Sequence, residues 1–403
     1  AVGFHAPCNF IVEFDRDQLE IAPDAEVEDA LGEDRPMTQA DIETVLAAAY
    51  ILPDGRMRAS ASLFLEGRPL GPWRYEGTRS DDPNDVIPHQ ERRELRGGRL
   101  LAAWLNHFDS REQNTLAMWV EEDGRNYVRH HYIDFGDCFG SRWEWDGITR
   151  RLGHSAYFDF PHVVADWLTF GAISRPWDEV EWSDRAPILG YYDSAHFEPE
   201  DWRPGYPNPA FLRMDDGDAA WMARIIAQIS DDHLRAMLDE SALSTPAHDA
   251  ELYATLIGRR DRILDHYLPI RSPLSHFEVG DDGTTLCFTD LGVSSGTFDE
   301  RTVTYESRAY YGTFDSIRWY RPEQVRPDDS GRSCVSLVYG DLGPAVNADL
   351  ADDDISHYFI FDISVIREPG AEPIPPARLH FYSTTEGFVL VGVERPEGSE
   401  PPL

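Results

Sequence analysis

The stretch that decides the fold runs from Trp104 to Gly140 and reads WLNHFDSREQNTLAMWVEEDGRNYVRHHYIDFGDCFG. Two polar patterns lie in it: His107, Asp109 and Asn114 in the spacing H-x-D-x-x-x-x-N, and the later tripeptide Asp134-Phe135-Gly136. The tripeptide alone is a weak signal, because this chain is rich in Asp, Phe and Gly. Both patterns in this order within about thirty residues arise by chance on the order of once in a thousand chains of such composition. We therefore treat the stretch as a candidate functional site.

The residue types suit phosphoryl transfer, in which a protein mainly positions groups and neutralises charge. Such a reaction needs a carboxylate near the attacking hydroxyl, and we assign this role to Asp109, with His107 as a second catalytic candidate. It also needs oxygen ligands for Mg²⁺, which we assign to Asn114 and Asp134. The cofactor-binding candidates are accordingly Asn114, Asp134, Phe135 and Gly136.

Local periodicity supports this interpretation. Residues 90–105 predict a helix, with Leu100, Leu101, Trp104 and Leu105 on one face. Residues 127–133 alternate as a strand does, which places Asp134 at a strand end. The sequence thus predicts a helix, a polar loop, a strand and the tripeptide in succession. The alternative is a buried hairpin whose polar residues only cap its turns.

Several longer segments resemble an uncharacterised bacterial family with a protein-kinase-like fold. They are RRELRGGRLLAAWLNHFDSREQN, VRHHYIDFGDCFGS, GPWRYEGTRSDDPNDVIPHQERRELRG and GYPNPAF. That family is distantly similar to HipA-type kinases, spore-coat CotH kinases and phosphoinositide kinases, which share the D-x-x-x-x-N and D-F-G-like pair. The resemblance covers most of residues 1–270. It implies a kinase-like fold and a phosphotransferase that uses ATP and Mg²⁺.

On this interpretation residues 1–70 form a partial N-lobe and hinge, and residues 71–270 form a helical C-lobe. Strands are expected at 9–14 and 56–65, a helix at 38–49, and further helices at 218–229, 231–238 and 249–268. The segment 161–170 resembles the central helix of a C-lobe, with Asp166 as a candidate partner of the catalytic loop. No segment before Asn9 can supply the earlier N-lobe strands, and the chain contains no lysine to hold nucleotide phosphates. The start of the N-lobe is therefore expected to be missing.

From about Arg271 the periodicity changes to two residues. Short alternating runs occur at 284–289, 302–310, 316–320, 334–339, 357–365, 378–382 and 388–393. Seven short strands separated by Gly, Pro and Asp predict an antiparallel β-sandwich over residues 271–398, fibronectin-III-like in pattern only. We expect this domain to bind a partner. The whole chain is then an α+β protein with a kinase-like unit followed by a sandwich.

The chain carries 36 basic and 73 acidic residues, which gives a net charge of −37. Such a surface repels nucleic-acid phosphates and anionic membranes, so neither is expected as a partner. The composition suits a protein adapted to high salt, and GC-rich codon usage explains the missing lysine equally well. No apolar run reaches the ~18 residues that a membrane-spanning helix needs.

The four cysteines, Cys8, Cys138, Cys287 and Cys334, are widely spaced and form no C-x-x-C pair. Zinc is therefore not expected, and no disulfide framework follows from the sequence. The first residue is alanine and no signal-peptide pattern follows it, so we expect a processed or truncated start. Both a cytoplasmic protein of a salt-adapted organism and an exported protein remain open.

Three functions compete on these observations. The first is an ATP-dependent phosphotransferase, or a catalytic fragment of one, that acts on an unidentified protein or small-molecule acceptor. The second is a pseudokinase-type binding or scaffolding protein without catalysis, which the missing lysine favours. The third is a carbohydrate-active protein, because Trp- and Asp-rich loops beside a sandwich suit sugars.

Overall fold

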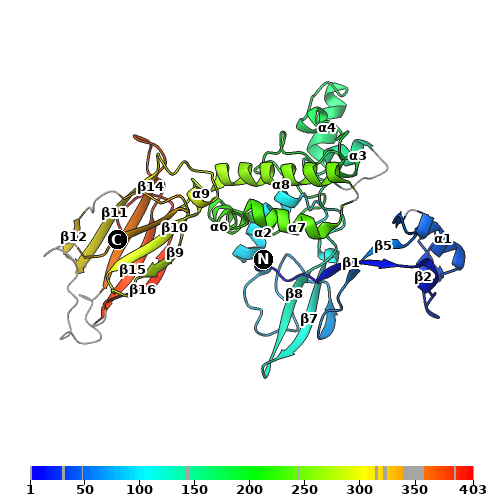
Figure 1. The fold of residues 1–403 in the computed structure, drawn as a ribbon, viewed down its shortest axis with the longest axis horizontal. Helices are drawn as coiled ribbons and strands as arrows, with labels where there is room; N and C mark the ends of the chain where they lie inside the picture. Colours follow the sequence, from blue (N-terminus) through cyan, green and yellow to red (C-terminus); the bar gives the residue numbers. More distant parts are fainter. Residues whose placement is uncertain are drawn as a thin grey trace.

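The computed structural model describes residues 2–29, 32–47, 49–140, 146–243, 245–313, 316–320, 325–338, 358–384 and 387–402. Helices and antiparallel sheets are both present, so the predicted α+β class is confirmed. The chain forms three regions in a row (Figure 1): an N-terminal unit of strands, a middle region of helices with a long hairpin, and C-terminal sheets.

The N-terminal unit is small and thinly packed. Its strands are β1 (Asn9–Phe14), β2 (Glu26–Glu28), β3 (Asp34–Pro36), β4 (Tyr50–Ile51) and β5 (Met57–Ser62), with helix α1 (Gln39–Ala47). The sheet order is β1-β5-β4, and β2 pairs with β3 alone. Every residue of β1 except Phe14 is exposed. The predicted elements at 9–14, 38–49 and 56–65 are therefore present, but they enclose almost no core of their own.

The middle region contains a three-stranded sheet and a group of helices. The strands, in the order β6-β7-β8, are β6 (Arg68–Gly71), β7 (Thr115–Glu122) and β8 (Arg125–Tyr132). The β7–β8 hairpin projects away from the helices (Figure 1). The helices are α2 (Arg93–Leu105), α3 (Asp146–Arg151), α4 (Phe160–Thr169), α5 (Pro176–Glu179), α6 (Asp216–Ile226), α7 (Asp231–Ser241) and α8 (Pro246–Tyr267). Short 3₁₀ turns lie at Arg16–Gln18, His89–Glu91, Glu112–Asn114, Pro187–Leu189 and Phe211–Arg213.

The helical core is formed by α2, α6 and α8. Leu100, Met222 and Ile263, one from each helix, are fully buried. An ion pair fixes α2 against the start of α6, because Arg96 donates to both carboxylate oxygens of Asp218 at 2.6 and 2.8 Å. Asp218 is itself buried and belongs to the N-cap box of α6, so the pair joins two helices at a defined register.

The segment expected as the central helix of a C-lobe is instead peripheral. Helix α4 has no buried residue, and it lies at the outer end of the helical region (Figure 1). Phe160, Trp167 and Phe170 are all more than half exposed. Asp166 pairs with Arg175 at 2.5 Å and not with the catalytic loop. That expectation was wrong, since the apolar periodicity of 161–170 does not face the core, and α8 takes the central place.

Beyond position 271 all the described strands lie in two antiparallel sheets. One sheet has the order β13-β10-β9 and the other the order β12-β11-β14-β15-β16. The strands are β9 (Leu274–Val279), β10 (Thr285–Asp290), β11 (Thr304–Thr313), β12 (Ser316–Tyr320), β13 (Arg332–Ser336), β14 (Tyr358–Ile366), β15 (Ala377–Thr384) and β16 (Gly387–Glu394), with the short helix α9 (Leu291–Ser294). Each expected run overlaps a strand, and position 339 of the fourth run and position 357 of the fifth lie outside the described residues.

A disulfide that the sequence did not predict joins two of these strands. Cys287 on β10 lies opposite Cys334 on β13 in the antiparallel register, and the two sulfur atoms are bonded. The two sheets meet through aromatic side chains, with the ring centroids of Phe288 and Tyr305 5.1 Å apart. Cys8 and Cys138 are free, the first exposed and the second buried.

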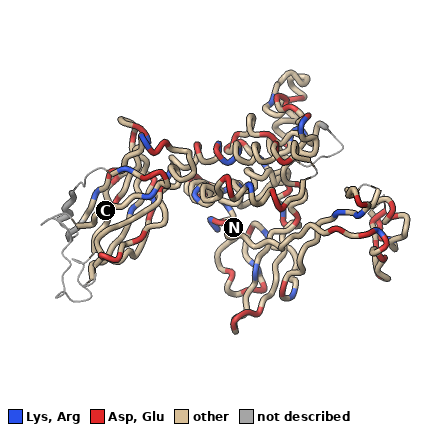
Figure 2. The backbone as a smooth tube through the Cα atoms, in the orientation of Figure 1, with Lys and Arg blue, Asp and Glu red and all other residues tan. Residues whose placement is uncertain are grey.

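The helices and the C-terminal sheets share one continuous hydrophobic core. The cluster of buried residues runs from Leu256 and Leu264 on α8 through Leu274 and Leu286 into the sheets. Acidic and arginine side chains are interspersed over all three regions (Figure 2). Within the described residues, no helix is long and apolar enough to cross a membrane.

Candidate functional site

The polar loop begins where α2 ends. Asn106 takes a left-handed conformation (φ 53°) at the C-cap, which turns the chain sharply out of the helix. The backbone N–H of His107 then returns to the carbonyl of Ala102 at 2.8 Å. The loop passes into β7 and returns along β8, and the N–H of Ile133 donates to the carbonyl of Asn114 at 3.0 Å. This last bond brings the two ends of the candidate stretch together.

Asp109 and Asn114 form a direct pair inside the loop. The Asn114 side-chain amide donates to the Asp109 carbonyl at 2.8 Å and to its Oδ2 atom at 2.9 Å. Arg111 lies on the other side, with its Nε atom 3.0 Å from Oδ1 of Asp109. Burial raises the pKa of Asp109 above its ordinary value, while Asn114 and Arg111 oppose the rise. One oxygen of the carboxylate thus accepts a hydrogen bond from Asn114, and the other lies in an ion pair with Arg111.

His107 is a buried, neutral side chain. Burial lowers its pKa to about 4, so the imidazole carries no charge near neutral pH. Its ring packs against that of Phe135 with 5.1 Å between centroids, and its Nδ1 atom has no hydrogen-bond partner among the described residues. A buried ring of this kind orients the loop and the tripeptide. It is poorly suited to exchange protons with a substrate.

The tripeptide is exposed and its first residue is strained. Asp134 has φ 58°, a backbone conformation that costs a non-glycine residue roughly 1 kcal/mol and persists where neighbouring structure imposes it. Asp134 and Asp137 lie close enough to Asp109 that their charges raise its pKa further, after the larger effect of burial. Three carboxylates therefore act on one another electrostatically at this end of the loop.

A cleft of about 730 Å³ opens beside the tripeptide. Its lining includes Leu116 and Met118 of β7, Ile133 and Asp134 after β8, and the residues at 60 and 62–65. Leu63 donates its backbone N–H to the carbonyl of Cys8 at 2.8 Å, whereas no hydrogen bond among the described residues engages the backbone of Phe64 or Leu65. The cleft thus offers apolar walls, free backbone groups and a carboxylate at one end.

The residues present could supply two protein ligands to Mg²⁺. Among the described residues, no group of three His, Cys, Asp or Glu side chains is arranged to hold a metal ion. Mg²⁺ commonly takes one or two protein ligands and completes its shell with water and phosphate oxygens. The Oδ1 atom of Asn114 and the carboxylate of Asp134 could supply these two ligands, because the Asn114 Nδ2 atom is already occupied by Asp109.

Sequence reasoning missed two residues of this site. Arg111 follows Asp109 by two positions, and its guanidinium lies over the ring of Tyr206 at 5.0 Å. Asp137 follows the tripeptide directly, and its charge raises the pKa values of both Asp109 and His107. Arg111 could have been found from its place beside a candidate base. The position of Tyr206 could not, since it lies almost a hundred residues further along the chain.

The structure brings together all six residues selected from the sequence. His107, Asp109 and Asn114 lie in the loop, and Asp134, Phe135 and Gly136 lie at the end of β8 beside it. Comparison of the chain with family models, with curated proteins and with solved structures found no match. The resemblance to kinase-like families is therefore tested by none of these comparisons, and the function has to be argued from the site.

Proposed function

We propose that this chain binds a magnesium nucleotide, with ATP as the expected phosphoryl donor, and transfers a phosphoryl group to a hydroxyl acceptor. The observation that carries the proposal is the hydrogen-bonded pair of Asp109 and Asn114, which lies within electrostatic reach of Asp134, a residue that lines an apolar cleft. Phosphoryl transfer depends on positioning and on charge neutralisation, and this arrangement offers groups for both.

Each side chain has a separate role in the proposal. Asp109 orients or deprotonates the acceptor hydroxyl, and its raised pKa strengthens it as a base relative to an ordinary aspartate. Asn114 and Asp134 hold the metal, which neutralises phosphate charge when it is bound. Arg111, next to Asp109, is the cation best placed to contact the transferred group, because a guanidinium binds phosphate oxygens through two parallel hydrogen bonds.

A second candidate is a nucleotide-binding or scaffolding protein without catalysis. It is favoured by the composition of the cleft, since no arginine is among the residues that line it and the chain has no lysine. The nucleotide phosphates would then depend for neutralisation on the metal and on Arg111 alone. The unidentified acceptor, and any partner of the C-terminal sheets, belong to either candidate.

Isothermal titration of the full chain with ATP, in the presence and absence of Mg²⁺, separates these possibilities. Asp134→Asn should weaken Mg-dependent nucleotide binding at least tenfold, because one hard oxygen ligand loses its charge. Asp109→Asn should keep nucleotide affinity within about twofold and abolish phosphoryl transfer, because Asp109 faces the acceptor. Asp123→Asn, in the exposed turn between β7 and β8, is the matched control and should change neither property.

The outcomes discriminate clearly. Nucleotide binding that requires Mg²⁺ and Asp134, without any transfer, would favour the non-catalytic candidate. If the folded chain binds no nucleotide at millimolar ATP with Mg²⁺, the phosphotransferase fails and the scaffolding candidate remains. Loss of binding in the Asp123 variant as well would attribute the effect to overall charge and not to the site.

A further inference from the structure

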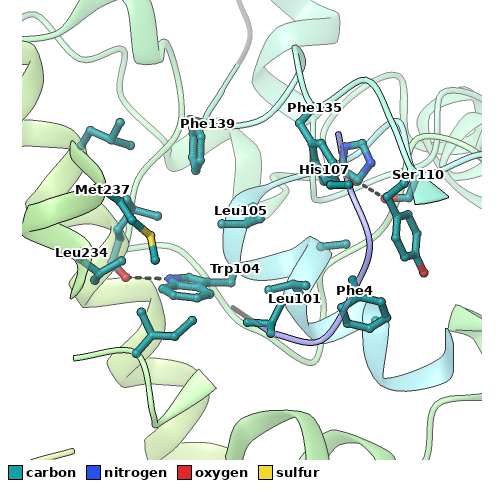
Figure 3. Close-up of a pocket in the computed structure, with 18 of the residues that line it drawn as sticks. Phe4, Leu101, Trp104, Leu105, His107, Ser110, Phe135, Phe139, Leu234 and Met237 are labelled. Carbon is teal, nitrogen blue, oxygen red and sulfur yellow. Dashed lines mark hydrogen bonds between the residues drawn. The ribbon is translucent and has the colours of Figure 1, made fainter. Parts of the chain in front are cut away.

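A second cavity shares Phe135 with the cleft. It encloses about 490 Å³ between the C-terminal part of α2, helix α7 and the N-terminal residues 2–6. Figure 3 shows Leu234 and Met237 of α7 across the cavity from Phe135, with Trp104 and Leu105 between them. A volume of this size is typical of sites that bind small molecules and too small for a folded partner.

The walls of this cavity are almost entirely apolar. Three of their polar groups are bonded within the protein, whereas the Nδ1 atom of His107 has no hydrogen-bond partner among the described residues. The indole N–H of Trp104 donates to the carbonyl of Leu256 at 2.8 Å. The hydroxyl of Ser110 donates to the carbonyl of His107 at 2.5 Å, and that of Ser241 to Leu238 at 2.7 Å. The walls therefore have little polar demand of their own, and an occupant gains affinity chiefly by removing apolar surface from water.

The surrounding charges decide which apolar molecules fit. Among the described residues no arginine lines the cavity, and burial keeps its histidine, His107, neutral. Asp134 and Asp137 lie close enough to this edge to act on His107 electrostatically. A carboxylate head group would therefore find no counter-ion and would face two like charges, which disfavours a fatty acid relative to an uncharged molecule of the same length.

We propose that this cavity is a binding site for a small uncharged apolar molecule, of the class of medium-chain alcohols or neutral aromatic compounds. The proposal rests on the cavity and its charges and does not depend on phosphoryl transfer. Phe135 lines both this cavity and the cleft, so an occupant of the cavity would contact the tripeptide through the Phe135 side chain. Bound ligand is thus in direct contact with a residue next to Asp134.

The test uses the full chain and the neutral fluorescent probe 1-aminoanthracene. We expect saturable binding of the probe with one site per chain, displacement by decanol, and displacement by decanoate only at concentrations at least tenfold higher. Decanol and decanoate have the same chain length, so the ratio of the concentrations at which they displace the probe isolates the effect of the head-group charge.

Matched variants on α7 locate the site. Met237 lines the cavity and is half exposed, so Met237→Asp should fold normally and weaken probe binding at least tenfold. Ala236→Asp adds the same charge to the adjacent, exposed position outside the lining and should stay within twofold of the unmodified chain. Circular dichroism of each variant monitors folding. If Met237→Asp does not fold, Leu105→Trp, which fills part of the cavity, provides the same test.

Several results would overturn the proposal. They are an absence of saturable probe binding, a failure of decanol to displace the probe, and unchanged binding in both cavity variants. Equal weakening by the Ala236 substitution would show that charge on α7, and not the cavity, controls binding. Displacement by decanoate as readily as by decanol would contradict the preference for an uncharged ligand.

Discussion

The side-chain amide of Asn114 donates to the Oδ2 atom of Asp109 over 2.9 Å, while Arg111 holds the other oxygen of the same carboxylate. Both oxygens of a buried aspartate are thereby oriented by groups from its own loop. The local sequence H-x-D-x-x-x-x-N thus encodes its own internal contacts. Beyond the larger effect of burial, the charges of Asp134 and Asp137 raise the pKa of Asp109. These two residues follow β8, whose antiparallel pairing with β7 brings them back to the loop.

The first prediction concerns pH and rests on the proposed phosphoryl transfer. Asp109 must be ionised to act as a base, and burial raises its pKa whereas the charge of Arg111 lowers it. Arg111→Gln should therefore shift the acid limb of kcat/KM to higher pH. Arg125→Gln, at the exposed start of β8, serves as the control and should leave the limb in place. A shift of the acid limb to lower pH would contradict the assignment of Asp109 as the base.

The second prediction concerns the connection between the N-terminal unit and β7. Gly67 has φ 99°, and a Cβ atom there would lie 2.2 Å from the carbonyl oxygen of Trp119. Gly71 has a similar φ of 92° with open space around it. We expect Gly71→Ala to cost about 1 kcal/mol of unfolding free energy and Gly67→Ala about 3 kcal/mol, measured by urea denaturation. Equal losses would mean that the backbone relaxes away from Trp119.

The third prediction concerns Arg259, which fixes the end of α2 just before the polar loop. Its guanidinium donates to the carbonyls of Ala103, Trp104 and Asp193 at 2.6 to 3.0 Å. Arg259→Met would leave these buried carbonyls without donors and should lower the unfolding free energy by about 3 kcal/mol or more. Arg262→Met, on the same helix but more exposed, should cost about 1 kcal/mol or less. Similar losses in both variants would count against a special role for Arg259.

The fourth prediction concerns the C-terminal sheets. Burial raises the pKa of Asp290 from 3.8 to about 6, although its carboxylate accepts hydrogen bonds from Gly292 and from the hydroxyl of Tyr305. A raised carboxyl pKa stabilises the fold below pH 3.8, and that stability is lost as the pH rises through about 6. Asp290→Asn should therefore match the unmodified chain near pH 4 and be more stable at pH 8, by up to about 3 kcal/mol.

Thermal unfolding at a series of pH values tests this expectation. Asp299→Asn is the control, because the pKa of this exposed carboxyl is lowered to about 2 by Arg301 and its substitution should give no gain at pH 8. If Asp290→Asn is less stable than the unmodified chain at pH 8, then the hydrogen bonds of the ionised carboxylate outweigh the cost of its burial.

The fifth prediction joins the two proposals through Phe135. Because this ring lines both the cleft and the apolar cavity, decanol and Mg-nucleotide should change each other's affinity by the same factor, as linkage requires. Titration of each ligand at saturating concentrations of the other measures the factor in both directions. Phe135→Ala should bring it toward one. A factor of one in the unmodified chain would show that the two sites are independent.

The sequence alone determined many of the elements and which residues belong to the polar loop. Alternating apolar residues located β1, β5 and the strands from β10 to β16 within a few residues, because side-chain period is a local property of the backbone, whereas β9 was not predicted. The spacing of Asp109 and Asn114 was sufficient to predict a shared loop, and their hydrogen bond follows from that short separation. Strand β7 was not predicted, since residues 115–122 lack clear alternation, although the hairpin could have been inferred from Asp123-Gly124.

Only the tertiary structure decided what depends on residues far apart in the chain. It showed that α4 is exposed and α8 is central. Amphipathic periodicity cannot distinguish these cases, because it identifies the apolar face of a helix but not the element that packs against this face. The tertiary structure also paired Cys287 with Cys334, placed Arg259 under the end of α2 and Tyr206 beneath Arg111, and opened an apolar cavity behind Phe135. These contacts join residues dozens to more than a hundred positions apart, and their free energy is gained only when the whole chain has packed.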